Sequence, residues 1–283
     1  GMRGLDYLRL NLGFDMTGND DIDYTASRSY FVANRMLGSN VTGLTLGNIG
    51  NTELQWETTN RLTAGLQGNF FNNRLSVRAN FFKSWTDNLL SLSRLAWTSG
   101  LEENWGNGGK LENMGFDVTA SVKAVNLKNF RWEVGASVGH YKNEVTALPN
   151  NNRPVETDIY GATVLTQVGQ PVGVFYGWDS DGVYATSAEA AAEGKYLVSG
   201  NGDHINFGAG DMRFKDVDNN HVIDNADRVV IGDPNPDLFG NIFTTLNWKN
   251  LTLSAAFNYS LGNDIYNYQR SLLEGGSLFL NQT

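Results

Sequence analysis

The fold is decided by an alternation that is clearest in Leu251-Thr252-Leu253-Ser254-Ala255-Ala256-Phe257-Asn258-Tyr259-Ser260. One set of alternate residues reads Leu, Leu, Ala, Phe, Tyr, and the other reads Thr, Ser, Ala, Asn, Ser. Side chains of a β-strand point alternately to opposite sides, so this stretch has one face that suits lipid and one that suits water. Its length and pattern are typical of a strand in a transmembrane β-barrel.

The same alternation recurs along the chain and predicts seven strands. They lie at about 5–14, 58–71, 74–88, 115–126, 129–143, 238–248 and 251–261. Several reach about ten residues, which is longer than the usual strand of a soluble sandwich. The sequence therefore predicts an all-β, antiparallel, up-and-down transmembrane β-barrel, of which this chain is a fragment.

The connections between these strands are of two kinds. Three are tight turns, at Asn72-Asn73, Leu127-Lys128 and Lys249-Asn250, with residues that tolerate turn geometry. The others are long, at about 15–57, 89–114 and 144–237. Because short and long connections alternate, all the short turns fall on one rim, as in outer-membrane barrels with short periplasmic turns and long extracellular loops.

Aromatic residues are expected to form a girdle at each rim of the barrel, where an amphipathic ring is stabilised between hydrocarbon and water. Those beside the short turns are Phe70, Phe71, Phe130, Trp132 and Trp248, and those near the opposite strand ends are Trp85, Tyr141 and Tyr259.

Composition excludes several classes of protein. The 283 residues include 32 glycines and 5 prolines, which suits extended strands joined by turns, and no cysteine, which removes disulfides and thiolate chemistry. The net charge of −9 argues against binding to nucleic acid. The chain has no apolar run of the roughly 18 to 20 residues that a membrane-spanning helix needs.

The N-terminus and the strand count indicate a piece of a longer protein. Gly1-Met2 resembles a remnant of cloning, and no signal peptide follows it, although a barrel protein must first cross the inner membrane. An odd number of strands does not close a bacterial barrel. We therefore expect residues 1–283 to be a partial barrel, with 144–237 as a long extracellular loop region. A short helix is expected at about 185–200, with Ser187 capping its start and Gly194 its end.

An acidic loop at 216–227 has the spacing of a calcium-binding loop of the EF-hand kind. The candidate ligands are Asp216, Asp218, Asn220, the carbonyl of Val222, Asp224 and Asp227. All these donors are oxygen, so the predicted ion is Ca²⁺ in a structural role, with Ile223 as the apolar anchor of the loop. His221 replaces the usual glycine and Asp227 the usual glutamate. The alternative is an acidic turn held by Asx hydrogen bonds without metal.

Other candidate sites have less support. His140, His204 and His221 lie in separate segments without zinc-ligand spacing. The carboxylate pairs Glu102-Glu103 and Asp179 with Asp181 have no defined separation for work on a glycoside. We therefore expect no catalytic residues and no enzymatic activity.

Several motifs, in order along the chain, resemble those of the SusC/RagA-type TonB-linked outer-membrane receptors. They are Gly50-Asn51-Thr52-Glu53-Leu54-Gln55-Trp56-Glu57-Thr58-Thr59, Leu75 with the aromatic strand up to Asp87-Asn88-Leu89-Leu90, Leu111-Glu112-Asn113-Met114-Gly115-Phe116, Gly169-Gln170-Pro171-Val172-Gly173-Val174-Phe175-Tyr176-Gly177-Trp178, Gly210-Asp211-Met212-Arg213-Phe214-Lys215-Asp216, Asp227-Arg228, Ile231-Gly232-Asp233-Pro234-Asn235-Pro236 and Gly262-Asn263-Asp264-Ile265-Tyr266-Asn267. Together they cover most of the chain and are specific as an ordered set. The family's acidic loop usually has glycine at the position of His221.

The resemblance implies the C-terminal portion of a plugged barrel of about 22 strands in a bacterial outer membrane. It implies uptake of a glycan or an oligopeptide, driven through TonB, beneath a lid formed by a SusD-like surface lipoprotein. It also implies that the plug and the segment that contacts TonB lie outside this chain, and that the long loop 144–237 contacts the lid or the substrate.

Two alternatives come from other classes of protein. The first is a calcium-stabilised surface β-sandwich that binds carbohydrate through exposed tryptophans such as Trp97 and Trp105, with its apolar faces buried against each other. The second is a glycoside-active enzyme that uses loop carboxylates.

Overall fold

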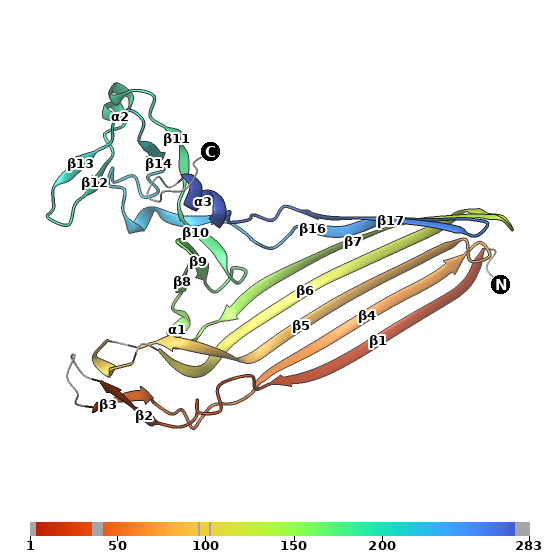
Figure 1. Ribbon diagram of the computed structural model, residues 1–283, viewed down its shortest axis with the longest axis horizontal. Coiled ribbons are helices and arrows are strands. Elements are labelled where there is room, and N and C mark those ends of the chain that lie inside the picture. The colour runs from red at the N-terminus through yellow and green to blue at the C-terminus, as the bar shows by residue number, and fades with distance from the viewer. Residues whose placement is uncertain (1–3, 36–41, 96, 102, 275–283) are drawn as a thin grey trace. The chain divides into compact units, whose positions relative to one another are not determined.

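The computed structural model describes residues 4–35, 42–95, 97–101 and 103–274 (Figure 1). The chain forms two compact units. The first, the wall unit, comprises residues 1–154, 167–172 and 235–262. The second, the loop unit, comprises 155–166, 173–234 and 263–283.

The wall unit is built on one antiparallel sheet of seven long strands, in the order β1-β4-β5-β6-β7-β16-β17 (Figure 1). Their bounds are β1 Leu5–Asn19, β4 Glu57–Phe70, β5 Leu75–Arg94, β6 Glu103–Asn126, β7 Phe130–Ala147, β16 Leu238–Trp248 and β17 Leu251–Leu261. Each strand of the sheet pairs with the next one in chain order. The seven predicted strands and their up-and-down connection are thus confirmed.

The short turns lie at one end of this sheet, as predicted, and the long connections leave from the other end (Figure 1). The predicted long connection 89–114 is wrong in part, because β5 and β6 continue as a paired ribbon to Arg94 and from Glu103. A bulge causes the discrepancy: the register shifts between Thr86 and Leu89, and Asn88 has a φ of 57°. The extra residue interrupts the alternation on which the prediction depended, while backbone pairing resumes beyond it.

The register aligns the alternating patterns of all seven strands into two continuous faces. One row across the sheet reads Leu10, Leu66, Ala79, Val118, Val138, Gly240 and Tyr259. The adjacent row, on the opposite face, reads Arg9, Gln67, Arg78, Thr119, Ser137, Asn241 and Asn258. One face of the sheet is therefore apolar and the other polar, over its full width.

The apolar face is exposed. Leu12 is 76% exposed, Leu10 66% and Phe257 74%. Within the described part of the chain, the strands of this sheet contribute only Val145 to the fully buried apolar side chains. The sandwich alternative required these side chains to be sealed between two sheets, so it is wrong for this sheet.

The sheet is open, with β1 and β17 as its two edge strands. Among the described residues neither edge pairs with another strand of the sheet, so no closed barrel is formed within this chain. The antiparallel all-β architecture is confirmed.

The aromatic residues beside the short turns lie largely on the apolar face. In the register, Phe130 pairs with Trp248, and Trp132 pairs with Leu246. The prediction for Tyr141 is wrong: it lies on the polar face, where its hydroxyl donates to Asn235 Oδ1 at 3.2 Å. Successive side chains of a strand lie on opposite faces of the sheet. Tyr141 is an odd number of residues from Trp132 in the same strand, so the two side chains lie on opposite faces.

Glycines on the polar face make room for aromatic rings from the paired strand. Gly139 faces Phe239 in the register, and a Cβ added at Gly139 would lie 2.7 Å from the ring of Phe239. Gly115 faces Phe82 in the same way, at 2.9 Å. Each ring therefore occupies space that a side chain at the facing glycine would need.

The first long connection of the wall unit contains a hairpin, β2 Tyr30–Arg35 with β3 Thr42–Asn48. Residues 49–56, which we call the strap, then lead back to β4. Asn107 of β6 holds this strap. Its Oδ1 accepts from the N–H of Gln55 at 2.8 Å, and its Nδ2 donates to the carbonyls of Gln55 at 2.7 Å and Asn88 at 2.8 Å. Short helices η1 Trp97–Ser99 and α1 Pro149–Asn152 complete this unit.

The loop unit accounts for most of the predicted loop region 144–237. It contains a four-stranded sheet in the order β15-β10-β9-β8 and two small ribbons, β11 with β14 and β12 with β13. The bounds are β8 Val155–Ile159, β9 Ala162–Thr166, β10 Val174–Trp178, β11 Ser180–Val183, β12 Tyr196–Val198, β13 His204–Asn206, β14 Met212–Phe214 and β15 Arg228–Gly232, with helices α2 Ser187–Glu193, η2 Asn225–Asp227 and α3 Tyr268–Glu274.

The predicted helix at 185–200 is confirmed as α2, with one correction. Its N-cap is Thr186, whose side chain accepts from the N–H of Glu189, and Ser187 is the first helical residue. Gly194 ends the helix in the left-handed conformation, φ 66°, as predicted. No helix in the described residues is both long and apolar enough to cross a membrane.

Candidate functional site

The acidic loop follows β14 and ends in η2. Its backbone is bent by its own side chains, because Asp and Asn oxygens accept hydrogen bonds from N–H groups a few residues ahead. Asp216 Oδ2 accepts from the N–H of His221 at 2.8 Å, and Asn220 Oδ1 accepts from that of Val222 at 2.6 Å. His221 has a φ of 65°, the left-handed conformation that explains why glycine is usual at this position.

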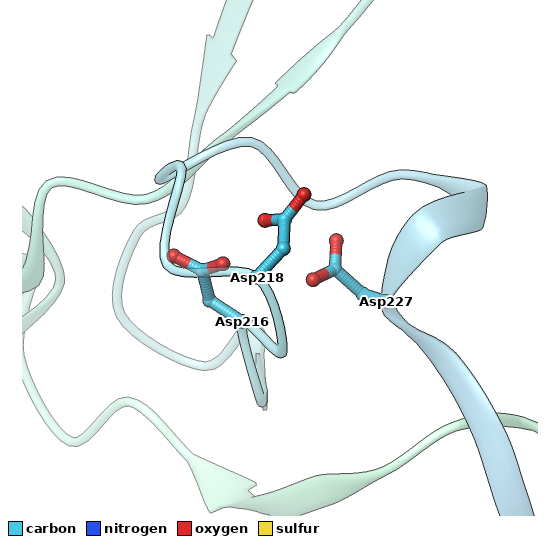
Figure 2. Close-up of side chains that lie close together, drawn as sticks. All are labelled: Asp216, Asp218 and Asp227. Carbon is cyan, nitrogen blue, oxygen red and sulfur yellow. The ribbon is translucent and has the colours of Figure 1, made fainter.

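Three carboxylates converge in this loop (Figure 2). Asp216, Asp218 and Asp227 each place an oxygen within 4.8 Å of the others. Asp227 is fully buried, and its two oxygens accept from the N–H groups of Val217 at 2.7 Å and Asp224 at 2.9 Å. Asp227, which follows Asp216 by eleven residues, is thus brought back to the first turn of the loop, as the EF-hand spacing predicts.

Asp224 and Asn220 have other partners. The carboxylate of Asp224 caps η2 by accepting from the N–H of Ala226 at 2.7 Å, and it is not part of the converging group. The amide of Asn220 donates to Asp218 Oδ2 at 2.9 Å, which places it beside the three carboxylates. The described geometry therefore brings together three of the predicted carboxylate ligands and leaves Asp224 aside.

The electrostatics of the cluster favour a cation. Burial alone would raise the pKa of Asp216, but the backbone N–H groups of His221 and Asn220 outweigh it and lower that pKa below its usual value. The carboxyl of Asp216 is therefore charged at neutral pH, close to two further carboxylates. Every converging donor is a hard oxygen, which fits Ca²⁺ better than a soft metal.

The loop is anchored as expected. Ile223 is 4% exposed, and its N–H donates to the carbonyl of Tyr196 in β12 at 2.9 Å. The N–H of Tyr196 in turn donates to the carbonyl of His221 at 3.0 Å. The geometry of the acidic loop is thus tied to the β12–β13 ribbon.

An ion-paired cluster beside α2 escaped the sequence analysis. Arg213 of β14 pairs with Glu189 at 3.1 Å and Asp181 at 3.0 Å, and Lys195 pairs with Glu193 at 2.9 Å. Burial raises the pKa of Tyr184 to about 12, and its hydroxyl donates to Glu193 at 3.0 Å. The partners come from separate elements without a local motif, so their spacing carried no signal. The contacts hold α2 on the β11–β14 ribbon.

The carboxylates considered for glycoside chemistry do not form a facing pair. Asp179 pairs with Lys215 at 2.6 Å and raises the pKa of that lysine, while Asp181 pairs with Arg213. Glu102 and the side chain of Glu103 lie outside the described residues.

The remaining candidates have structural partners. Trp105, expected as an exposed binding residue, is half-buried in β6, and the side chain of Trp97 lies outside the described part. His204 stacks on Tyr196 with ring centroids 3.9 Å apart, and His140 Nδ1 lies 2.6 Å from the carbonyl of Asp237.

Comparison with curated proteins finds relatives over most of the chain. The chain is 31% identical over 277 residues to TonB-dependent receptor P3 of Formosa agariphila, and the match covers 95% of this chain and 27% of that protein. It is 31% identical over 268 residues to TonB-dependent receptor P26 of the same organism, covering 92% and 26%. It is 25% identical over 273 residues to TonB-dependent receptor SusC of Bacteroides thetaiotaomicron, covering 93% and 26%. The chain spans about a quarter of the length of these relatives.

Solved structures share the fold. The RagAB peptide transporter matches with a TM-score of 0.75 and 24% identity, over 98% of this chain and 29% of that chain. The RagAB peptide importer in its open-open state matches with a TM-score of 0.71 and 24% identity, over 93% and 27%. No protein-family model matches the chain. The curated relatives are named receptors, in keeping with an expectation of no enzymatic activity.

Proposed function

Because the chain is a homologue of the SusC/RagA-type TonB-dependent receptors, we propose that it forms part of the wall of a transmembrane β-barrel in a bacterial outer membrane. The complete receptor would take up a nutrient oligomer, a glycan or an oligopeptide, using energy delivered through TonB. In this proposal the chain supplies wall strands and extracellular loops and performs no catalysis.

The observation that carries the proposal is the exposed apolar face of the wall unit. It runs without interruption across seven strands and is backed by a polar face. Leaving leucine and phenylalanine side chains in water would cost about 25 cal/mol for each Å² of apolar surface. A lipid environment removes that cost, and the polar face would then line the enclosed space.

The edges and the rims complete the proposal. Among the described residues, no strand pairs with the outer edges of β1 and β17, and in a bilayer the backbone groups of those edges must pair with further strands of a closed barrel. The short turns would face the periplasm and the long connections, including the loop unit, the cell exterior. A SusD-like lipoprotein would then meet the long connections, and TonB would act through parts of the receptor outside this chain.

The membrane part of the proposal can be tested by site-directed labelling, since the chain has no cysteine. Single cysteines at Leu66 and Phe257 would carry nitroxides on the apolar face, with matched controls at Gln67 and Asn258 on the polar face. In the receptor reconstituted in vesicles, labels on the apolar face should be relaxed by lipid-soluble oxygen, and the controls by a water-soluble nickel chelate. Equal access of the chelate to all four positions would exclude a lipid-facing wall.

The transport part is tested in cells. A strain that lacks the receptor should lose energy-dependent accumulation of one class of labelled oligomer, glycan or peptide, and the gene should restore it. Accumulation that persists after a protonophore dissipates the proton gradient would contradict uptake driven through TonB.

We also propose that the acidic loop binds a structural Ca²⁺ ion. The convergence of Asp216, Asp218 and Asp227 within 4.8 Å supports it. Calorimetric titration of the receptor with Ca²⁺ should show a heat of binding that is absent from the Asp216→Ala, Asp218→Ala variant. The matched control is Asp179→Ala, a half-buried aspartate of the same unit whose carboxylate pairs with Lys215 and lies outside the cluster. Equal heats from the double variant and the parent would dispose of the site.

A further inference from the structure

Each short turn of the wall unit carries one cation and at least one asparagine, and none carries a carboxylate. The turns read Phe71-Asn72-Asn73-Arg74, Leu127-Lys128-Asn129 and Lys249-Asn250. Arg74, Lys128 and Lys249 are all exposed. We call these three turns, which lie at one end of the sheet, the short-turn rim (Figure 1).

The cations of the short-turn rim lack carboxylate partners, whereas lysines toward the opposite end of the sheet have them. Across the described ranges, no ion pair involves Arg74, Lys128 or Lys249. The paired lysines are Lys83 with Glu112 at 3.0 Å, Lys110 with Asp87 at 2.8 Å and Lys142 with Glu144 at 2.6 Å. Among the described residues, the ion pairs of this sheet therefore lie toward the end of the long connections, and the three turn cations of the short-turn rim take part in none.

A large apolar side chain accompanies each cation. Phe71 is 60% exposed, Leu127 64% and Trp248 54%. Lys249 Nζ lies 5.6 Å from the centre of the Trp248 ring. An apolar anchor beside a cation suits the boundary between hydrocarbon and headgroups, where the anchor is buried and the charge reaches outward.

The backbone holds this arrangement in place. The N–H of Lys249 donates to the carbonyl of Asn129 at 2.9 Å, so two of the turns are joined. The nearby carboxylate of Asp6 accepts from the N–H of Asn73 at 2.8 Å and so stabilises the third turn. The three cations are thus displayed from ordered turns.

We propose that the short-turn rim binds the anionic headgroups of phospholipids in the leaflet that surrounds it. The inference rests on the proposed function, because it requires the wall unit to lie in a bilayer. An anionic headgroup supplies the charge that the three cations lack, while its acyl chains cover the apolar anchors and the adjoining apolar face. An anionic membrane surface attracts such cations by about 1 kcal/mol each, which corresponds to about five-fold in the local concentration of anionic lipid per cation.

The experiment uses the intact receptor that contains this chain, reconstituted in vesicles of phosphatidylethanolamine with a minor share of a headgroup-labelled lipid. A fluorophore on a single cysteine at Asn129 reports the lipid next to the rim. Its quenching by labelled phosphatidylglycerol should exceed that by labelled phosphatidylethanolamine, and raised salt should reduce the difference. In the Lys128→Gln, Lys249→Gln variant the preference should fall by about five-fold for each cation removed.

Two control variants accompany it. Lys128→Arg, Lys249→Arg keeps both charges and should keep the preference, and Lys110→Gln, Lys142→Gln removes two charges at the other end and should also keep it. If the Gln variant does not insert, the salt titration of the parent and the Arg variant decide the question.

Several outcomes would overturn the inference. Equal quenching by the two lipids in the parent would mean that the rim does not select anionic headgroups. Full suppression of the difference by millimolar inorganic phosphate, at constant ionic strength, would indicate a small-anion site instead. The proposed function fails separately, when neither labelled lipid quenches the probe and the protein is therefore not in the bilayer.

Discussion

Leu12 offers the sharpest test of the apolar face. It is 76% exposed and lies on β1 midway along the apolar residues Leu8 to Met16. Those eight residue steps span about 27 Å at roughly 3.4 Å each, or about 21 Å of height if the strand tilts by about 40°. This is close to the apolar band of about 25 Å of an outer-membrane barrel, with Leu12 near its middle.

Replacing Leu12 by arginine should therefore be costly in a membrane. An arginine on the lipid face near the midplane costs about 2–4 kcal/mol, and near the interfaces about 0–1 kcal/mol. The matched control is Asn11→Arg, one residue away on the polar face, opposite Gly65 in the register. It should change stability by less than about 1 kcal/mol, because the new charge stays in water.

The assay is urea unfolding of the receptor in lipid vesicles, followed by tryptophan fluorescence and by the heat-dependent shift of folded barrels on gels. Leu12→Arg should lower the unfolding midpoint, and Asn11→Arg should leave it nearly unchanged. An equal loss in the two variants, or a larger loss from Asn11→Arg, would refute the assignment of the two faces.

Three further predictions concern the rest of the chain. Gly139→Ala should lower the free energy of unfolding by about 1–3 kcal/mol, because the added Cβ would lie 2.7 Å from the ring of Phe239. In the control Gly106→Ala the added Cβ meets nothing within 4 Å, so the loss should be smaller. Urea unfolding compares the two variants. Asn107→Ala removes two hydrogen bonds to Gln55 in the strap before β4 and a third to Asn88 of β5, at about 0.5–1.5 kcal/mol each. Hydrogen exchange should increase in that strap but not in the loop unit, and unchanged exchange would contradict the role. The hydrogen bond from Lys195 lowers the pKa of Glu193 below its usual 4.5. The stability that this pair gives α2 is therefore present above that value and is lost as the pH falls below it. Proteolysis from about pH 6 to about pH 3 should show this loss of stability in the parent and a smaller loss in Glu193→Gln.

Prediction from sequence succeeded where the physical cause is local. Alternation at period two placed all seven strands of the large sheet of the wall unit, because a strand with one apolar and one polar side must divide its side chains in the same way. The acidic spacing at 216–227 likewise predicted that Asp227 returns to Asp216 and Asp218, since Asx turns bend the loop from within.

Where the cause is not local, the sequence was insufficient. The bulge at Asn88 hid the extension of β5 and β6, and Thr186 displaced Ser187 as the cap of α2 because the turn geometry, rather than residue type, selects between neighbouring hydroxyls.

The sequence by itself determined the approximate positions of the seven strands of the large sheet, the two-sidedness of each of them, the rim on which the short turns lie and the acidic loop. Only the tertiary structure decided the register that joins seven separate patterns into one apolar face. It also decided the ion pairs of the lysines toward one end of the sheet, whereas the turn cations at the other end have no carboxylate partner among the described residues. The reason is that periodicity is a property of one strand, whereas a continuous surface and its charge balance depend on which residues of different strands stand next to each other.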